Sequence, residues 1–116
     1  MYAVEGTTIK MTRGDTVEIE VEILRNGDAY TPQEGDAVRF AMKRAAMNSK
    51  QSAFKDAEPL VVKAIPIDTM VLRLDPEDTK PYEFGEYAYD MQITFANGKV
   101  STFIADARLV LMPEVD

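Results

Sequence analysis

Six carboxylates make residues 75–90 the first place to look for chemistry: Asp75, Glu77, Asp78, Glu83, Glu86 and Asp90. Such a cluster could bind calcium, or two facing carboxylates could hydrolyse a glycosidic bond. The spacing does not match an EF-hand loop, which needs oxygen ligands at alternate positions and a glycine at its sharp bend. Asp75 as N-cap, with Pro76 and acidic residues directly behind it, is typical of a short helical turn. We therefore predict a helical turn here, without a metal or a cofactor.

A second candidate is the tripeptide Arg13-Gly14-Asp15, which cell-adhesion receptors bind. It lies between a short strand expected to end near Thr12 and a longer strand expected to start at Thr16. Glycine at such a position is typical of a turn. We interpret the tripeptide as a turn that depends on Gly14, and an adhesion ligand is the alternative hypothesis.

Aromatic side chains offer a third possibility, a platform on which sugar rings could stack. The candidates are Tyr82, Phe84, Tyr87 and Tyr89. Tyr87 and Tyr89 alternate with charged or small residues, which is typical of side chains that point into a core. We therefore favour core positions for most of this set, with one hydroxyl bonded to the backbone as in a tyrosine corner. Carbohydrate binding remains the alternative.

Basic residues gather around residues 44–58, which we predict to be a long loop in an otherwise acidic chain. They are Lys43, Arg44, Lys50 and Lys55. Such a cluster could be an electrostatic docking patch for an acidic partner, or simply a solvated loop.

Composition excludes several classes of chemistry. The chain has no cysteine and no histidine, which excludes disulfides, thiolate zinc sites, cysteine nucleophiles and histidine-based triads. Its net charge of −7 would repel a nucleic-acid backbone, so we predict that neither DNA nor RNA is a partner. We also predict that the protein is not an enzyme.

Length and hydropathy favour one small domain over residues 1–116. The chain has 116 residues, of which 46% are hydrophobic, and this is enough for one packed core. It lacks an apolar run near the roughly 20 residues of a membrane-spanning helix, and it lacks a signal peptide, so we expect no membrane contact and a cytoplasmic origin.

The elements that would position these residues are strands. Val17, Ile19, Val21 and Ile23 alternate with glutamates, which predicts one long strand over residues 15–24 with a wet outer face. Similar alternation predicts strands in DAVRFAMKR, DTMVLRLD and GEYAYDMQITF, and we expect shorter strands in TTIKM and PLVVKA. Asn97-Gly98 predicts a two-residue type I′ turn, followed by a return strand with a bend near residues 105–107.

These elements together predict an all-β fold, an immunoglobulin-like antiparallel β-sandwich of about seven strands. A small barrel is the alternative. Only the architecture can be shared with antibody domains, because their Cys…Trp…Cys framework is missing.

Several segments follow one another in an order that matches a known family: RGDT, VRFAMKR, EPLVVKAI, the acidic helical turn, GEYAYDMQITFANGKVST and LMPEVD. Together they cover most of the chain. They resemble the amino-terminal domain of the baseplate upper proteins and related tail-associated proteins of phages and prophages in Gram-positive bacteria.

The resemblance implies a structural module that attaches to the tail or baseplate hub, in the virion and, during assembly, in the host cytoplasm. Larger family members continue into a linker and a receptor-binding scaffold, which we expect this chain to lack because it ends at Asp116. The implied partners are other tail proteins, with several copies of this chain in the assembly. The pattern residues, expected to fix the fold, are Gly14, Gly85, Tyr87, Tyr89, Asp90, Gln92, Gly98 and Thr102. A carbohydrate-binding or adhesive immunoglobulin-like module is the alternative function.

Overall fold

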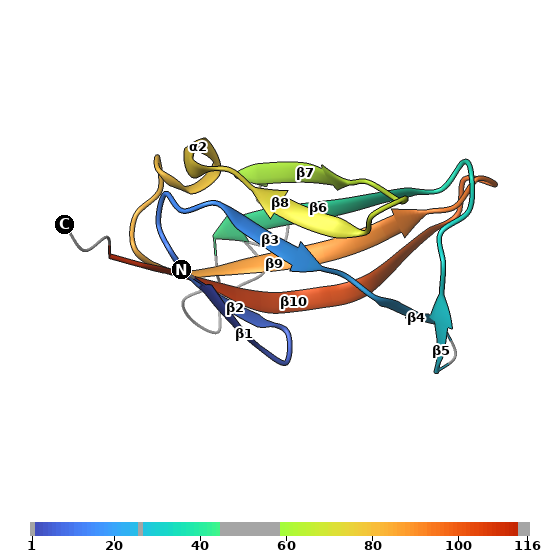
Figure 1. Ribbon diagram of the computed structural model, residues 1–116, viewed down its shortest axis with the longest axis horizontal. Helices are drawn as coiled ribbons and strands as arrows, with labels where there is room; N and C mark the ends of the chain where they lie inside the picture. Colours follow the sequence, from blue (N-terminus) through green and yellow to red (C-terminus); the bar gives the residue numbers. More distant parts are fainter. Residues whose placement is uncertain (1, 26, 45–58, 114–116) are drawn as a thin grey trace.

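The structure, a computed structural model, describes residues 2–25, 27–44 and 59–113 (Figure 1). Strands dominate these residues, and the described part contains one short helix, α2 (Pro76–Thr79). The all-β prediction is confirmed. In these ranges, no helix has the length and apolar character needed to cross a membrane.

A curled six-stranded sheet forms the larger layer, in the order β1-β2-β10-β9-β6-β7. Its strands are β1 (Tyr2–Glu5), β2 (Thr8–Thr12), β10 (Val100–Met112), β9 (Gly85–Thr94), β6 (Ala37–Arg44) and β7 (Val61–Ile65). Neighbours are antiparallel except β2 and β10, which run parallel. The prediction of purely antiparallel pairing is therefore wrong at this ladder. After β2 the chain leaves for the second layer, so β2 can lie beside β10 in the same direction.

The second layer is the antiparallel pair β3 (Val17–Glu20) and β8 (Val71–Leu74). Figure 1 shows this pair lying over the six-stranded sheet. Val17, Leu72 and Leu74 are buried in one hydrophobic cluster with sheet residues such as Phe40 and Met42. The core therefore lies between the two layers.

The long strand predicted over residues 15–24 is two strands. β3 ends at Glu20, and β4 (Ile23–Arg25) pairs with a different partner, β5 (Asp28–Tyr30). The Val21 N–H donates to the Met70 carbonyl at 2.8 Å, and Met70 has φ 51 just before β8 begins. The ladder stops here because β8 supplies no further partner. Alternation along one strand does not reveal the length of its neighbour, and this is why the prediction failed.

The hairpin between β9 and β10 is present as predicted, but its turn differs. The Gly98 N–H donates to the Phe95 carbonyl at 2.8 Å, and the Phe95 N–H donates to the Lys99 carbonyl at 2.8 Å. The loop therefore has three residues, with Gly98 at φ 90 and Asn97 outside the positive-φ region. This geometry is a type I turn followed by a left-handed residue, which needs one positive φ where a type I′ turn needs two.

The predicted bend near residues 105–107 is confirmed. The register of β10 against β9 shifts between Thr102 and Ile104 and again between Ile104 and Ala107. Asp106, inside the second shift, has φ 52. These bulges bend β10 while it stays paired with β9 on both sides of them.

Candidate functional site

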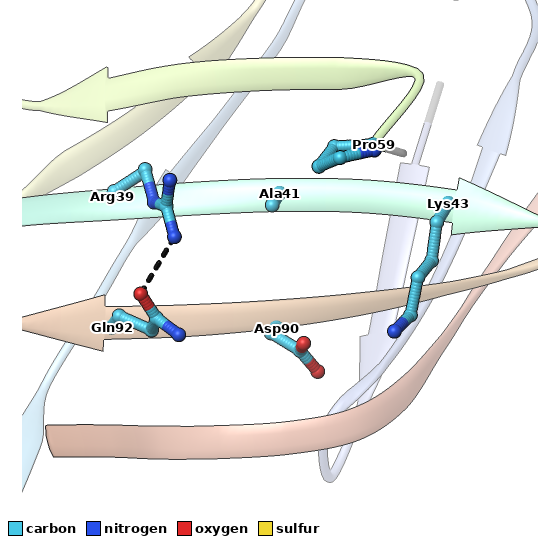
Figure 2. A pocket seen from close by; sticks show the side chains of 6 residues that line it. All are labelled: Arg39, Ala41, Lys43, Pro59, Asp90 and Gln92. Carbon is cyan, nitrogen blue, oxygen red and sulfur yellow. Dashed lines mark hydrogen bonds between the residues drawn. The ribbon is translucent and has the colours of Figure 1, made fainter. Parts of the chain in front are cut away.

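A shallow hollow of about 90 Å³ lies on the outer face of the six-stranded sheet (Figure 2). It is lined by Arg39, Ala41 and Lys43 from β6, Asp90 and Gln92 from β9, and Pro59. On β6 these residues alternate with Val38, Phe40 and Met42, which are buried in the core. Successive side chains of a strand point to opposite faces, so the hollow faces away from the core.

Small and long side chains shape the hollow. Ala41 lies directly opposite Asp90 across the two strands, and it leaves space between the longer Arg39 and Lys43 (Figure 2). Arg39 Nη2 donates to Gln92 Oε1 at 2.7 Å. Lys43 enters no ion pair with any residue of the described ranges. The described lining of the hollow therefore carries two cations, Arg39 and Lys43, and one carboxylate, Asp90.

Asp90 has a structural contact as well as a place in the hollow. Its Oδ1 accepts a hydrogen bond from the Asp106 N–H at 2.9 Å. That N–H belongs to the bulge of β10, where regular pairing with β9 is interrupted. The carboxylate thus replaces a ladder hydrogen bond and holds the bulge against β9.

The predicted docking residues do not form one patch. Lys43 lines the hollow and is half-buried. Arg44 is exposed at the end of β6, beside Tyr87 on β9, and alternation places it on the opposite face from Lys43. Lys50 and Lys55 lie outside the described residues, as does the loop predicted over residues 44–58 except for Arg44, which belongs to β6.

Two of the pattern tyrosines are core residues, as predicted. Tyr87 and Tyr89 are buried. The Tyr87 hydroxyl donates to the Glu83 carbonyl at 2.7 Å, and the Tyr89 hydroxyl donates to the Thr7 carbonyl. Burial raises the pKa of both phenols, that of Tyr89 to about 12. The predicted hydroxyl-to-backbone bond is therefore present in both of these tyrosines.

The remaining pattern residues are three glycines and residues of the outer face. Gly14, Gly85 and Gly98 all have positive φ, at 86, 134 and 90. Thr102 is exposed and pairs with Gln92 across the outer face.

The tripeptide at residues 13–15 is a turn, as predicted, and it packs against the segment after α2. Gly14 N–H donates to Thr79 Oγ1 at 2.8 Å, and Arg13 Nη1 donates to the Tyr82 carbonyl at 3.2 Å. The Arg13 guanidinium also lies 4.4 Å from the centroid of the Phe84 ring. Arg13 is therefore engaged by its own chain.

The same contacts limit the aromatic platform. Tyr87 and Tyr89 are buried, so Tyr82 and Phe84 are the members of the set that reach the surface. The Tyr82 hydroxyl donates to the Leu60 carbonyl at 2.9 Å, and the Phe84 ring, 48% exposed, carries Arg13 on one face.

The first three carboxylates of the acidic cluster, Asp75, Glu77 and Asp78, lie in the predicted helical turn. Asp78 accepts the Asp75 N–H at 2.7 Å, at the start of α2. Lys63 Nζ lies 2.8 Å from Asp78 and 3.2 Å from Asp75, while Arg73 Nε lies 2.8 Å from Asp75. Arg73 and Lys63 lower the pKa of Asp75, and Asp78 raises the pKa of Lys63. Across the part of the chain that the structure describes, no three potential metal ligands gather into a site.

Sequence reasoning missed Asp36, which joins two distant loops. Its Oδ2 accepts the Tyr30 hydroxyl at 2.7 Å and the Gln33 N–H at 2.8 Å, and its Oδ1 accepts the Ala96 N–H at 3.0 Å. Neighbouring Gly35 lies so close to Ala96 that an added Cβ would be 2.8 Å from the alanine Cβ. The Gly-Asp pair before β6 signals a turn, but no local pattern names a partner 60 residues away.

Comparison with protein-family models, with curated proteins and with solved structures found no match for this chain.

Proposed function

We propose that the chain is a non-enzymatic assembly protein of a phage or prophage tail or baseplate. It docks to other virion proteins through the outer face of its six-stranded sheet, first in the host cytoplasm and then in the virion. The observation that carries the docking surface is the hollow with Arg39 and Lys43 at its rim. The motif order described above supports the class of partner.

The charge of this face supports an acidic partner. Across the strands Lys43, Ala88 and Arg108 form one row, and Lys10 and Glu86 flank Val110 in the next row. Asp106 adds a third carboxylate, 3.9 Å from Arg108. With Arg39 and Asp90 included, the described side chains of this face carry a small surplus of basic over acidic groups, although the chain has a net charge of −7. Such a local surplus attracts an acidic surface and sets its orientation on contact.

The fold proposed for this module is a single immunoglobulin-like sandwich over residues 1–116. Two features support it: the β3–β8 pair packs over the larger sheet, and Tyr87 bonds to the backbone carbonyl of Glu83 just upstream. A tyrosine that hydrogen-bonds to the backbone a few residues upstream is a hallmark of such sandwiches.

The test is co-expression with the neighbouring tail genes, followed by size-exclusion chromatography with light scattering. The chain should co-elute with at least one tail protein, and Lys43→Glu should weaken this association by about tenfold. Lys99→Glu makes the same charge change in the exposed β9–β10 loop and is the matched control. A chain that joins none of these proteins, yet binds a cell-wall glycan, would favour the carbohydrate-binding or adhesive alternative.

A further inference from the structure

The surface opposite the hollow carries acidic side chains. On β3, Val17 is buried, whereas Glu18 and Glu20 are exposed, and Glu22 is exposed just beyond the strand. Arg73 on β8 pairs with Glu18 at 3.6 Å. Glu20 and Glu22 have no ion-pair partner in the described ranges. We call Glu18, Glu20 and Glu22 the acidic face.

The acidic face and the outer face of the sheet point in opposite directions. Val17 of β3 and Phe40 of β6 lie in the same core cluster, so each layer turns its apolar side toward the other. The polar sides must then face outward on opposite surfaces of the protein. Figure 1 shows β3 and β8 lying over the six-stranded sheet.

We propose that the outer face of one copy docks against the acidic face of a second copy, with Glu20 of the second copy seated in the hollow. This inference rests on the proposed function, because it names a partner for the same docking face. The carboxylate would lie between Arg39 and Lys43, on the same hollow as the Asp90 carboxylate, whose Oδ1 accepts the Asp106 N–H. Arg39 donates from Nη2 to Gln92 and has further N–H donors for the carboxylate. The Lys43 ammonium group has three N–H donors.

Charge complementarity selects a second copy in this head-to-tail orientation. The outer face has a surplus of basic residues and the acidic face a surplus of carboxylates, so unlike faces attract and like acidic faces repel. Because the contact joins two different patches, each copy keeps one unused patch, and the pair together keeps one of each kind. Repetition then builds a ring if the rotation closes, or a filament if it does not.

The first measurement is sedimentation velocity of the purified full chain over a range of concentrations. We expect self-association at about 0.1 M salt and its loss at about 1 M, because the Debye length falls from roughly 10 Å to roughly 3 Å. A chain that stays monomeric at low salt would overturn the inference. If that monomer still joined tail proteins on co-expression, the proposed function would stand. Self-association without any tail partner would leave the inference standing and count against the proposed function.

Matched variants then test the head-to-tail geometry. Glu20→Lys and Lys43→Glu should each weaken self-association at least about tenfold. An equimolar mixture of the two should recover association, because each variant supplies the face that the other lacks. Glu34→Lys and Lys99→Glu, with the same charge changes at exposed loop positions, should associate like the unmodified chain. A Glu20→Lys protein that still self-associates like the unmodified chain would overturn the proposal.

Discussion

The Gly14 N–H donates to the Thr79 hydroxyl at 2.8 Å across 65 residues of sequence. The Thr79 side chain is buried, with 1% of its surface exposed. Its hydroxyl needs a partner there, and the turn after β2 supplies one. This hydrogen bond therefore joins the turn between β2 and β3, which leads from the larger sheet to the second layer, to the end of α2.

Removing this acceptor should destabilise the fold. Thr79→Val keeps the side-chain shape but leaves the Gly14 N–H without its partner, which should lower the free energy of unfolding by about 1–3 kcal/mol. Thr79→Ser keeps the hydroxyl and should retain the hydrogen bond. Urea unfolding of the three proteins measures the difference. A loss in the serine variant with none in the valine variant would mean that packing of the Thr79 methyl group, and not the hydrogen bond, stabilises this contact.

The backbone conformation of Gly14 should matter independently of that bond. Gly14→Val places a β-branched residue at φ 86, which should lower stability by about 1 kcal/mol or more. Gly14→Asn should cost less, because asparagine tolerates positive φ. Thermal melts compare the two variants, and equal melting temperatures would contradict a conformational cause.

Asp75 should make the protein sensitive to acid. Its pKa is lowered in the folded state by Arg73 and Lys63, so the stabilisation is present above the ordinary value of 3.8 and is lost as the pH falls through the lower folded value. Asp75→Asn keeps a capping residue but removes this ionisation. Thermal melts from neutral to strongly acidic pH should therefore show a shallower acid dependence in the variant. An unchanged dependence would assign the acid sensitivity to other carboxylates.

Tyr89 should ionise later than an ordinary phenol. Burial raises its pKa to about 12, so the corresponding stabilisation is present below the ordinary value of 10 and is lost as the pH rises toward 12. An ultraviolet titration of phenolate absorbance should show a component near that upper value, and Tyr89→Phe should remove it. Persistence of the late component in the variant would place it on another tyrosine.

Local patterns in the sequence predict the elements but not their partners. The outward glutamates of β3, the turn at Gly14 and the helical turn after Asp75 follow from alternation, glycine and capping, which depend on near neighbours in the chain. The break after Glu20 and the parallel pairing of β2 with β10 depend on which strand lies alongside, and alternation carries no such information.

The candidate site was predicted only in part for the same reason. Lys43, Asp90 and Gln92 were singled out, but nothing local indicates that they meet around Ala41. The hollow arises from the register of β6 against β9, where a small residue lies between two long ones.

The most direct test of the docking surface uses a single thiol, because the chain has no natural cysteine. Ala41→Cys places one at the base of the hollow, and Ala29→Cys places another on exposed β5 as the control. The rate of maleimide labelling is measured for each variant, alone and in the assembly that forms on co-expression with the neighbouring tail genes. Assembly should slow labelling at Ala41→Cys at least about tenfold, because a partner excludes solvent from the centre of a contact, and should leave Ala29→Cys unchanged. Equal labelling of Ala41→Cys in the free and assembled protein would contradict docking through this face.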